Sequence, residues 1–271
     1  MSAKFDKNSF KKRLSTMLGV DFRRMFTSPL FYLMVGISLV VPILILVMVT
    51  MMEGSVSVNP QTGEETIMEG FKSVWEMIGS SSVASTDASA GMSMSITSMC
   101  NINMMFFAIA VFVCIFVGDD FRSGYAKNLF TVRSNKGDYV ISKTLVSWIA
   151  GGVMIIAFFI GSMIGGKFAG VSFTLDGANA FNVLMCMLSK VMLVGIFASI
   201  YVLASVIAKQ RLWMSILLSL GIGMLMFMMI PIITPLNSTI VHLLLCVVGS
   251  VLFGVGIGFG SKAILNKTSL V

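Results

Sequence analysis

The residues best suited to chemistry form a charged, aromatic segment between two apolar runs, FVGDDFRSGYAKNLFTVRSNKGDYVISK at positions 116–143. Asp119 and Asp120 are expected to cap a short helix, because side-chain oxygens accept hydrogen bonds from the free N–H groups at a helix start. Three apolar residues follow at helical spacing on one face: Phe121, Tyr125 and Leu129. The pattern predicts a short helix with an aromatic ridge, suited either to docking in a groove of another protein or to lying on lipid headgroups.

Charged residues flank this ridge and would set the register of a docked partner. Arg122 and Lys127 lie beside the apolar face, and Arg133 follows the predicted helix. The stretch Ser134–Gly137 has the composition of a turn, and Asp138 is expected to cap the next helix. We therefore expect residues 119–139 to form a rigid connection between two spanning helices.

Other candidate chemical sites have little support. Gly161–Phe168, GSMIGGKF, matches the pattern G-x-x-x-x-G-K, but a phosphate loop needs Ser or Thr after the lysine to hold magnesium, and Phe168 stands there. The four cysteines are widely spaced and His242 is the single histidine, so neither a zinc site nor a disulfide framework is predicted. We expect no catalytic, metal-binding or cofactor-binding residues in this chain, and no enzyme activity of its own.

The composition indicates an integral membrane protein. Hydrophobic residues make up 56% of the 271 positions and charged residues 11%, against about 25% charged in a soluble domain. A helix needs about 20 apolar residues to cross a bilayer. Six runs qualify: Leu30–Met52, Ile102–Gly118, Leu145–Ile164, Val191–Ala208, Leu212–Ile233 and Ile240–Gly260. The second and fourth are short and are expected to extend towards Met92 and Phe181. We predict an all-α membrane protein with six transmembrane helices within residues 30–271.

Basic residues predict the orientation, because cytoplasmic loops carry an excess of Lys and Arg. All but three of the 19 basic residues fall in the leader, in the segment after the second run, in the fourth connection or in the tail. The opposite side has only Lys72 and Lys167 among many acidic residues. Both termini are therefore predicted to be cytoplasmic. The same bias accounts for the net charge of +7 without a nucleic-acid partner.

Two segments outside the spans are expected to be helical. In the leader, residues 1–29, apolar residues recur at helical spacing from Phe10 to Phe26 with basic residues between them, which predicts an amphipathic helix in the inner interface before Pro29. In the outer loop, residues 53–97, the stretch Thr66–Gly79 predicts a short interfacial helix anchored by Trp75.

Lys190 is the one ionisable residue at the edge of a predicted span that could enter the bilayer. Inserting a lysine at mid-bilayer costs about 2.5–3.5 kcal/mol of free energy, so a lysine kept there commonly has a function. Lys190 is therefore a candidate pathway residue. However, Val191–Ala208 is almost long enough without it, which favours a lysine extended to the outer interface. Because the spans otherwise contain no carboxylates, ion-coupled transport and intramembrane proteolysis are disfavoured.

Paired glycines recur at G-x-x-x-G spacing, which lets helix backbones approach closely in lipid. The pairs are Gly161/Gly165, Gly254/Gly258 and Gly256/Gly260. We expect them to pack helices within the subunit rather than between two copies.

The order of these elements resembles the permease subunits of ABC-2 type transporters over most of the chain. The shared features are the amphipathic leader, six spans, a long first outer loop and a charged segment between spans two and three. In that family the segment has acidic residues, a glycine followed by a helix, a Ser/Arg turn and a lysine that enters span three. The matching residues here are Asp119, Asp120, Gly124, Arg133, Ser134 and Lys143. This chain departs from the pattern with Asp for the commoner Glu, with Tyr125 where Thr is usual, and with no proline in VRSNKGDY.

The resemblance implies that the charged segment is a coupling helix seated in a separate ATP-hydrolysing subunit, which would hold the ATP and magnesium. It also implies a homodimer of permeases with two ATPases, surrounded by the lipids of a bacterial cell membrane. The Met/Phe-rich form is most similar to exporters of amphipathic peptides. The expected coupling residues are Asp119, Asp120, Phe121, Arg122, Tyr125, Lys127 and Arg133. Two alternatives remain, an ion-coupled secondary transporter and a non-transporting membrane protein of the immunity or structural kind.

Overall fold

The structure is a computed structural model that describes residues 7–58, 65–67, 70–79, 100–132, 136–175 and 177–267. Long apolar helices make up most of it. The α-helices are α1 (Lys7–Thr27), α2 (Pro29–Met52), α4 (Met105–Arg122), α5 (Tyr125–Val132), α6 (Lys136–Ala169), α7 (Ala180–Ala208), α8 (Leu212–Phe227), α9 (Ile230–Ile233) and α10 (Ile240–Lys267). The described residues also form two 3-10 turns, η1 (Val74–Met77) and η2 (Ile102–Met104), and two strands, β1 (Val56–Val58) and β2 (Glu65–Ile67).

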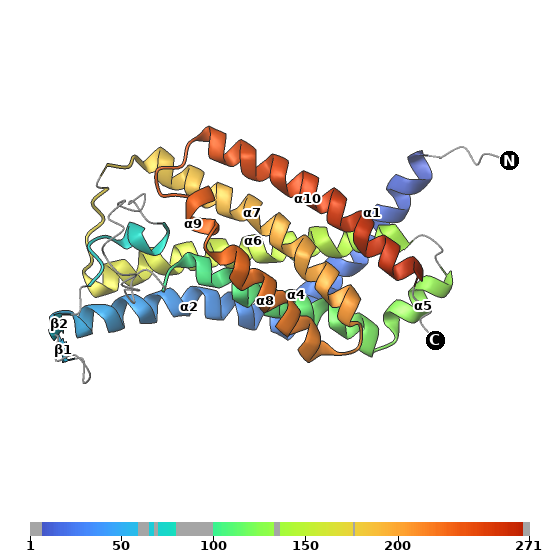
Figure 1. The fold of residues 1–271 in the computed structure, drawn as a ribbon, viewed down its shortest axis with the longest axis horizontal. Coiled ribbons are helices and arrows are strands. Elements are labelled where there is room, and N and C mark those ends of the chain that lie inside the picture. The colour runs from blue at the N-terminus through green and yellow to red at the C-terminus, as the bar shows by residue number, and fades with distance from the viewer. Residues whose placement is uncertain are drawn as a thin grey trace.

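Among the residues that the structure describes, five helical segments are long and apolar enough to cross a membrane: α2, η2 with α4, α6, α7 and α10. They run along the length of an elongated bundle (Figure 1). The helix α1, the short helix α5 and the last residues of α10 gather at one end, and the β1–β2 hairpin and η1 lie at the other. The chain is therefore an all-α membrane protein with one small hairpin.

The helices follow the predicted apolar runs, with longer ends. The helix α2 coincides with the first run to within a residue, and α7 extends back past Phe181, as expected. The expected extension of the second run towards Met92 is wrong, because Asn101 caps η2 and the helical segment begins at Ile102. The last run continues to Lys267. The predicted run Leu212–Ile233 is divided, because α8 ends at Phe227 and Pro231 lies in the first turn of α9. Since proline has no N–H to continue the hydrogen-bond ladder, it favours a new helix start over an unbroken span.

Close packing of α6 on α2 depends on glycine. A Cβ atom added at Gly161 would overlap the backbone carbonyl of Leu39, and one at Gly165 would lie 2.8 Å from the Cα of Ile43. The prediction of packing within the subunit is confirmed for this pair. It is wrong for Gly256, Gly258 and Gly260 of α10, where an added Cβ would meet no atom within 4 Å.

The predicted interfacial helix over Thr66–Gly79 is wrong. Residues 65–67 form β2, which pairs antiparallel with β1, and only the single turn η1 follows. This turn is held by the loop after α6, because the Val74 N–H donates to the Ser172 carbonyl (3.0 Å) and the Trp75 indole donates to the Phe173 carbonyl (3.0 Å). Hydrogen bonds to a distant loop outweighed the local helical pattern. The outer-loop residues 80–99 lie outside the described residues.

Candidate functional site

The predicted coupling segment contains the end of α4, a turn at Gly124, the short helix α5 and the start of α6. The helix α4 continues through Asp119 and Asp120 to Arg122, and the Ser123 N–H donates to the Asp119 carbonyl (2.9 Å). The chain turns at Gly124, whose φ of 74° lies in the region that favours glycine. The two aspartates therefore end α4 rather than cap α5, and that prediction is wrong. Lys136 and Gly137 likewise belong to α6, while Ser134 and Arg133 lie outside the described residues.

Asp120 lies at the centre of a buried charge cluster that joins three helices. Its carboxylate forms ion pairs with Arg24 of α1 and with the Lys143 Nζ of α6 (2.7 Å). The Tyr139 hydroxyl donates to the same carboxylate at 3.0 Å. Lys143 also pairs with Asp21 of α1 at 2.9 Å. We call these residues and Ser142, whose hydroxyl donates to Asp21 at 2.6 Å, the buried charge cluster.

The composition of this cluster allows it to exist in a low-dielectric environment. Asp21, Asp120 and Lys143 are fully buried, and burying an ion costs several kcal/mol unless it is paired and hydrogen-bonded. Two carboxylates and two cations leave the cluster without net charge. Asp120 also lies at the C-terminal end of α4, where the helix dipole disfavours an anion. The cations of α1 and α6 offset this disadvantage, so Asp120 holds both helices against α4.

Arg24 remains charged although it is half-buried. Burial by itself lowers the pKa of the Arg24 guanidinium, but the charge and hydrogen bond of Asp120 oppose this effect. With smaller contributions from Asp21 and Tyr125, the pKa is raised above its ordinary value. The guanidinium also lies over the Tyr125 ring, with Cζ 4.4 Å from the ring centre. Arg24 therefore connects α1 to the start of α5.

Sequence reasoning missed Asp21 and misjudged Lys143. Asp21 lies between Met17 and Met25 at four-residue spacing, and all three are buried on one face of α1. A lone acid in the middle of an amphipathic helix's apolar face was the available signal. Lys143 contributed to the count of cytoplasmic charges, yet its side chain is fully buried. Both buried carboxylates, Asp21 and Asp120, lie outside the predicted apolar runs, at the charged end of the bundle.

The aromatic ridge of the coupling segment packs inward. Phe121 is buried, Tyr125 is half-buried beneath Arg24, and Leu129 packs against the hydrophobic core. Phe130 of α5 meets Tyr139 edge-on at a centroid distance of 5.2 Å. This face therefore provides contacts that attach α5 to its own bundle, and docking of the ridge on another protein stays a prediction.

The charged residues of the corner lie on the surface. Asp119, Arg122 and Lys127 are exposed. The first two, together with Arg24 and Ser123, line a surface depression of about 500 Å³. The predicted coupling residues thus separate into an inner group that builds the corner, Asp120, Phe121 and Tyr125, and an outer group available to a partner.

Lys190 forms a second buried polar site in the bundle. It is fully buried, and its Nζ donates to Asn103 Oδ1 (2.7 Å) and Thr234 Oγ1 (2.9 Å). The prediction of a lysine extended to the outer interface is wrong, because α7 begins at Ala180 and places Lys190 well inside the helix. Within the described part of the chain no carboxylate pairs with it. The amine instead connects η2 and α9 through neutral oxygens.

Cysteine and metal chemistry find no support among the described residues. The four cysteines are free, and Cys114, Cys186 and Cys246 are buried. No group of three metal-ligating side chains occurs in the parts of the chain that the structure describes.

Comparisons with models of protein families, with curated proteins and with solved structures found no match to this chain. Its class therefore follows from its own features. It is an all-α membrane protein with apolar helices long enough to span a bilayer and with a buried charge cluster at one end of the bundle.

Proposed function

We propose that the chain is the membrane-spanning permease subunit of an ATP-driven exporter, which acts with a separate ABC ATPase and a second permease copy. The observation that carries this proposal is the rigid corner of α4, α5 and α6. A force applied to α5 would pass into both long helices, because Asp120 and Lys143 pair directly across them at 2.7 Å. ATP hydrolysis in the partner would then tilt these helices and alter the central pathway.

Docking on the ATPase is assigned to the outer charges rather than to the aromatic ridge. Asp119, Arg122 and Lys127 are exposed and of both signs, which suits a specific register on a partner more than general attraction to lipid. The adjacent depression of about 500 Å³ would receive a side chain of the partner. The inner residues of the corner have the separate role of transmitting the motion.

The proposed topology has six passes and a cytoplasmic corner, in a bacterial cell membrane. The divided helix α8–α9 runs back along the bundle beside α4 and α7 (Figure 1) and supplies the sixth pass. The end that holds α5 also holds α1 and the C-terminal end of α10. Exposed basic residues such as Arg122, Lys127 and Lys267 gather there, as the positive-inside tendency requires of a cytoplasmic end.

The proposed cargo is an amphipathic or apolar peptide. The chain contains 24 methionines and 21 phenylalanines. Methionine is unbranched and polarizable, so it adapts to varied apolar ligands.

The proposal is tested by purifying the tagged full chain from its native membranes in a gentle detergent and identifying bound proteins by mass spectrometry. We expect a soluble P-loop ATPase with the wild-type chain. The double variant Arg122→Glu/Lys127→Glu should lose it, because both changes reverse exposed charges on the corner. Arg211→Glu is the matched control, since Arg211 is also exposed and lies in the connection between α7 and α8. Absence of any ATPase, under conditions that preserve a known ABC complex, would remove the proposal.

An ion-coupled secondary transporter is the second candidate, and the buried Lys190 is the observation that favours it. Ionisable residues enclosed in a helix bundle commonly mark ion pathways. Transport into sealed vesicles driven by a proton gradient, without ATPase and abolished by Lys190→Met, would support this candidate. Transport that requires ATP and the partner, and is unchanged by the same substitution, would exclude it.

A further inference from the structure

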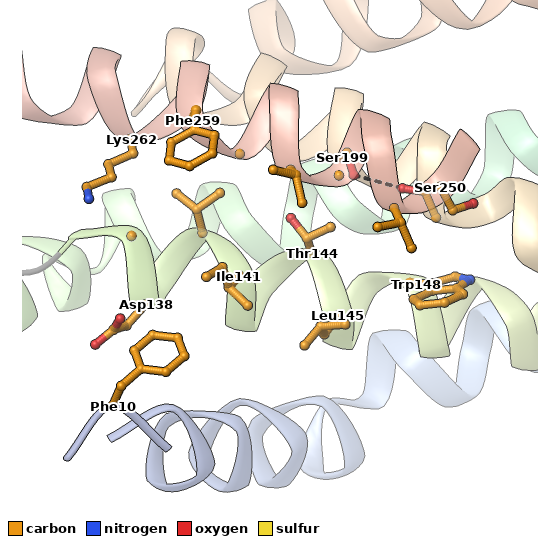
Figure 2. A pocket seen from close by; sticks show the side chains of 17 residues that line it. Phe10, Asp138, Ile141, Thr144, Leu145, Trp148, Ser199, Ser250, Phe259 and Lys262 are labelled. Atoms are coloured by element: carbon orange, nitrogen blue, oxygen red, sulfur yellow. Dashed lines mark hydrogen bonds between the residues drawn. The ribbon is translucent and has the colours of Figure 1, made fainter. Parts of the chain in front are cut away.

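An apolar groove of about 550 Å³ runs between α6 and α10 (Figure 2). Gly195 and Ser199 of α7 also line it, and Phe10 of α1 lies at one end beside Asp138. Trp148 and Ser250 lie at the other end. From Ser250 to Lys262 the α10 wall measures about 18 Å at 1.5 Å per residue. The groove is thus long and narrow, with one end at the charged end of the bundle.

Three polar side chains along the groove form hydrogen bonds within the protein. The Ser199 hydroxyl donates to the Gly195 carbonyl (2.8 Å), and the Ser250 hydroxyl donates to the Met192 carbonyl. The Trp148 indole donates to the Val191 carbonyl at 2.8 Å. These bonds leave a mainly hydrocarbon surface with little to offer water. In a bilayer such a surface must be covered by hydrocarbon.

Asp138 and Lys262 are the ionisable residues among the described side chains that line the groove. Asp138 is neutralised by an ion pair with Arg13 at 3.4 Å. Lys262 faces the groove from α10 and forms no ion pair within the described residues. A cation at the membrane-interface end of an apolar groove complements a molecule with an anionic head and an apolar tail. A basic pocket between transmembrane helices on the cytoplasmic side binds anionic lipid headgroups for this reason.

We propose that this groove binds one acyl chain of an anionic phospholipid, with the phosphate at Lys262. Exposed apolar residues of α10, including Val251, Val255 and Phe259, form the lipid-facing wall, so the site is open to the bilayer from the side. The bound chain would also contact Phe10 and so help to hold α1 against α6. This lipid site does not depend on the proposed transport function.

Photolabelling of the full-length chain in vesicles tests the proposal. The probe is phosphatidylglycerol with a diazirine in one acyl chain, compared with phosphatidylcholine that carries the same chains. Labelled peptides are identified by mass spectrometry. We expect the anionic probe to label the groove segments of α6 and α10 preferentially. Lys262→Gln should reduce this labelling about fivefold, the size expected for the loss of one lysine–anionic lipid contact.

Filling the groove gives a second, independent variant. Gly258 lines the groove, and an added Cβ there meets no atom within 4 Å, so Gly258→Leu fills lipid space without distorting the bundle. Gly256→Leu is its matched control, because Gly256 has equally open surroundings but does not line the groove. Lys267→Gln is the control for Lys262→Gln, since Lys267 lies at the same end of α10 outside the groove. Both controls should label like the wild-type chain.

Three results would overturn the proposal. Equal groove labelling by the anionic and zwitterionic probes, unchanged by Lys262→Gln, would mean ordinary lipid contact. Labelling unaffected by Gly258→Leu would place the lipid elsewhere. A photoreactive residue placed at Val255 could instead cross-link two chains while the lipid probe no longer labels the groove. That result would mean that a second copy occupies the groove.

Discussion

At the residue scale, the buried charge cluster shows how single side chains connect distant parts of the chain. Asp21, Asp120 and Lys143 come from three helices and are all fully buried. Each charge depends on the others, because a buried ion without its partner loses hydration and gains nothing in return. The cluster therefore behaves as one unit in its effect on stability.

Lys143→Met should lower the stability of the folded chain by about 3–5 kcal/mol, because it leaves Asp21 and Asp120 with one cation, Arg24, between them. The measurement is the thermal unfolding midpoint of the detergent-purified chain. Lys127→Met is the control, since the Lys127 side chain is exposed and should change stability little. Equal midpoints for the two variants would contradict the buried cluster.

The double variant Asp21→Asn/Lys143→Met should be less destabilised than the sum of the two single variants. Removing both charges avoids an uncompensated ion, and residues in direct contact show coupling energies of about 0.5–3 kcal/mol. A double-mutant cycle on the same unfolding midpoints measures this coupling. Strict additivity would mean that the 2.9 Å ion pair contributes no interaction energy.

Lys190 should resist amine-reactive reagents in native membranes, whereas Lys127 should react. The Lys190 amine is fully buried and donates to Asn103 and Thr234, so a reagent cannot reach it without opening the bundle. Peptide mass spectrometry after labelling of sealed and permeabilised vesicles measures the modified fraction of each lysine. Rapid modification of Lys190 from the outer side would instead favour the extended lysine that the sequence suggested.

At the scale of elements, α6 is the helix that connects the most features. It meets α1 through the buried charge cluster, α2 through Gly161 and Gly165, and α10 across the apolar groove. Leu39 and Ile43 of α2 lie so close to the α6 backbone at Gly161 and Gly165 that no side chain would fit at these two positions. The position of α6 is therefore set by contacts on several sides, and motion of α5 would be passed to it as a whole.

Gly161→Leu should lower the free energy of unfolding by about 1–3 kcal/mol or more, as is typical of overpacking. The reason is that the new side chain would overlap the Leu39 backbone carbonyl. Gly256→Leu is the comparison, since its surroundings on α10 are open. The measurement is the yield of monodisperse protein together with its unfolding midpoint in detergent. Similar values for both variants would show that α2 and α6 do not pack as described.

At the scale of the whole molecule, the two ends of the bundle differ in chemistry. One end has the charged corner, α1 and the end of α10, and the other has the hairpin and the turn η1 (Figure 1). This division supports the proposed orientation, in which the charged end lies in the cytoplasm.

Cysteine labelling of intact cells tests this orientation. The background chain carries Cys100→Ser, and Phe173→Cys or Lys127→Cys is added to it. A membrane-impermeant thiol reagent should label the Phe173→Cys variant in intact cells and the Lys127→Cys variant only after permeabilisation. Phe173 and Lys127 are both exposed, at opposite ends of the bundle, and the remaining cysteines are buried and should stay unlabelled. Labelling of both positions in intact cells, or the reverse order, would reject the orientation.

The sequence by itself determined the membrane class and the course of the long helices. An apolar run of about 20 residues can satisfy its backbone in lipid only as a helix, so runs such as Leu30–Met52 predict α2 without knowledge of its neighbours. The same local pattern also indicated the packing of Gly161 and Gly165, but it did not distinguish them from Gly256 and Gly260, whose surroundings are open. These features depend on residues that are close together along the chain.

Only the tertiary structure decided how the polar side chains are paired. Asp21 and Lys143 are far apart in sequence, and their contact depends on α1 lying against α6. The aromatic ridge of Tyr125 and Phe121 turned inward, because the bundle offered it Arg24 and Tyr139 as partners. Hydropathy is a local property of the chain, whereas the partner of a buried charge is set by which helices become neighbours.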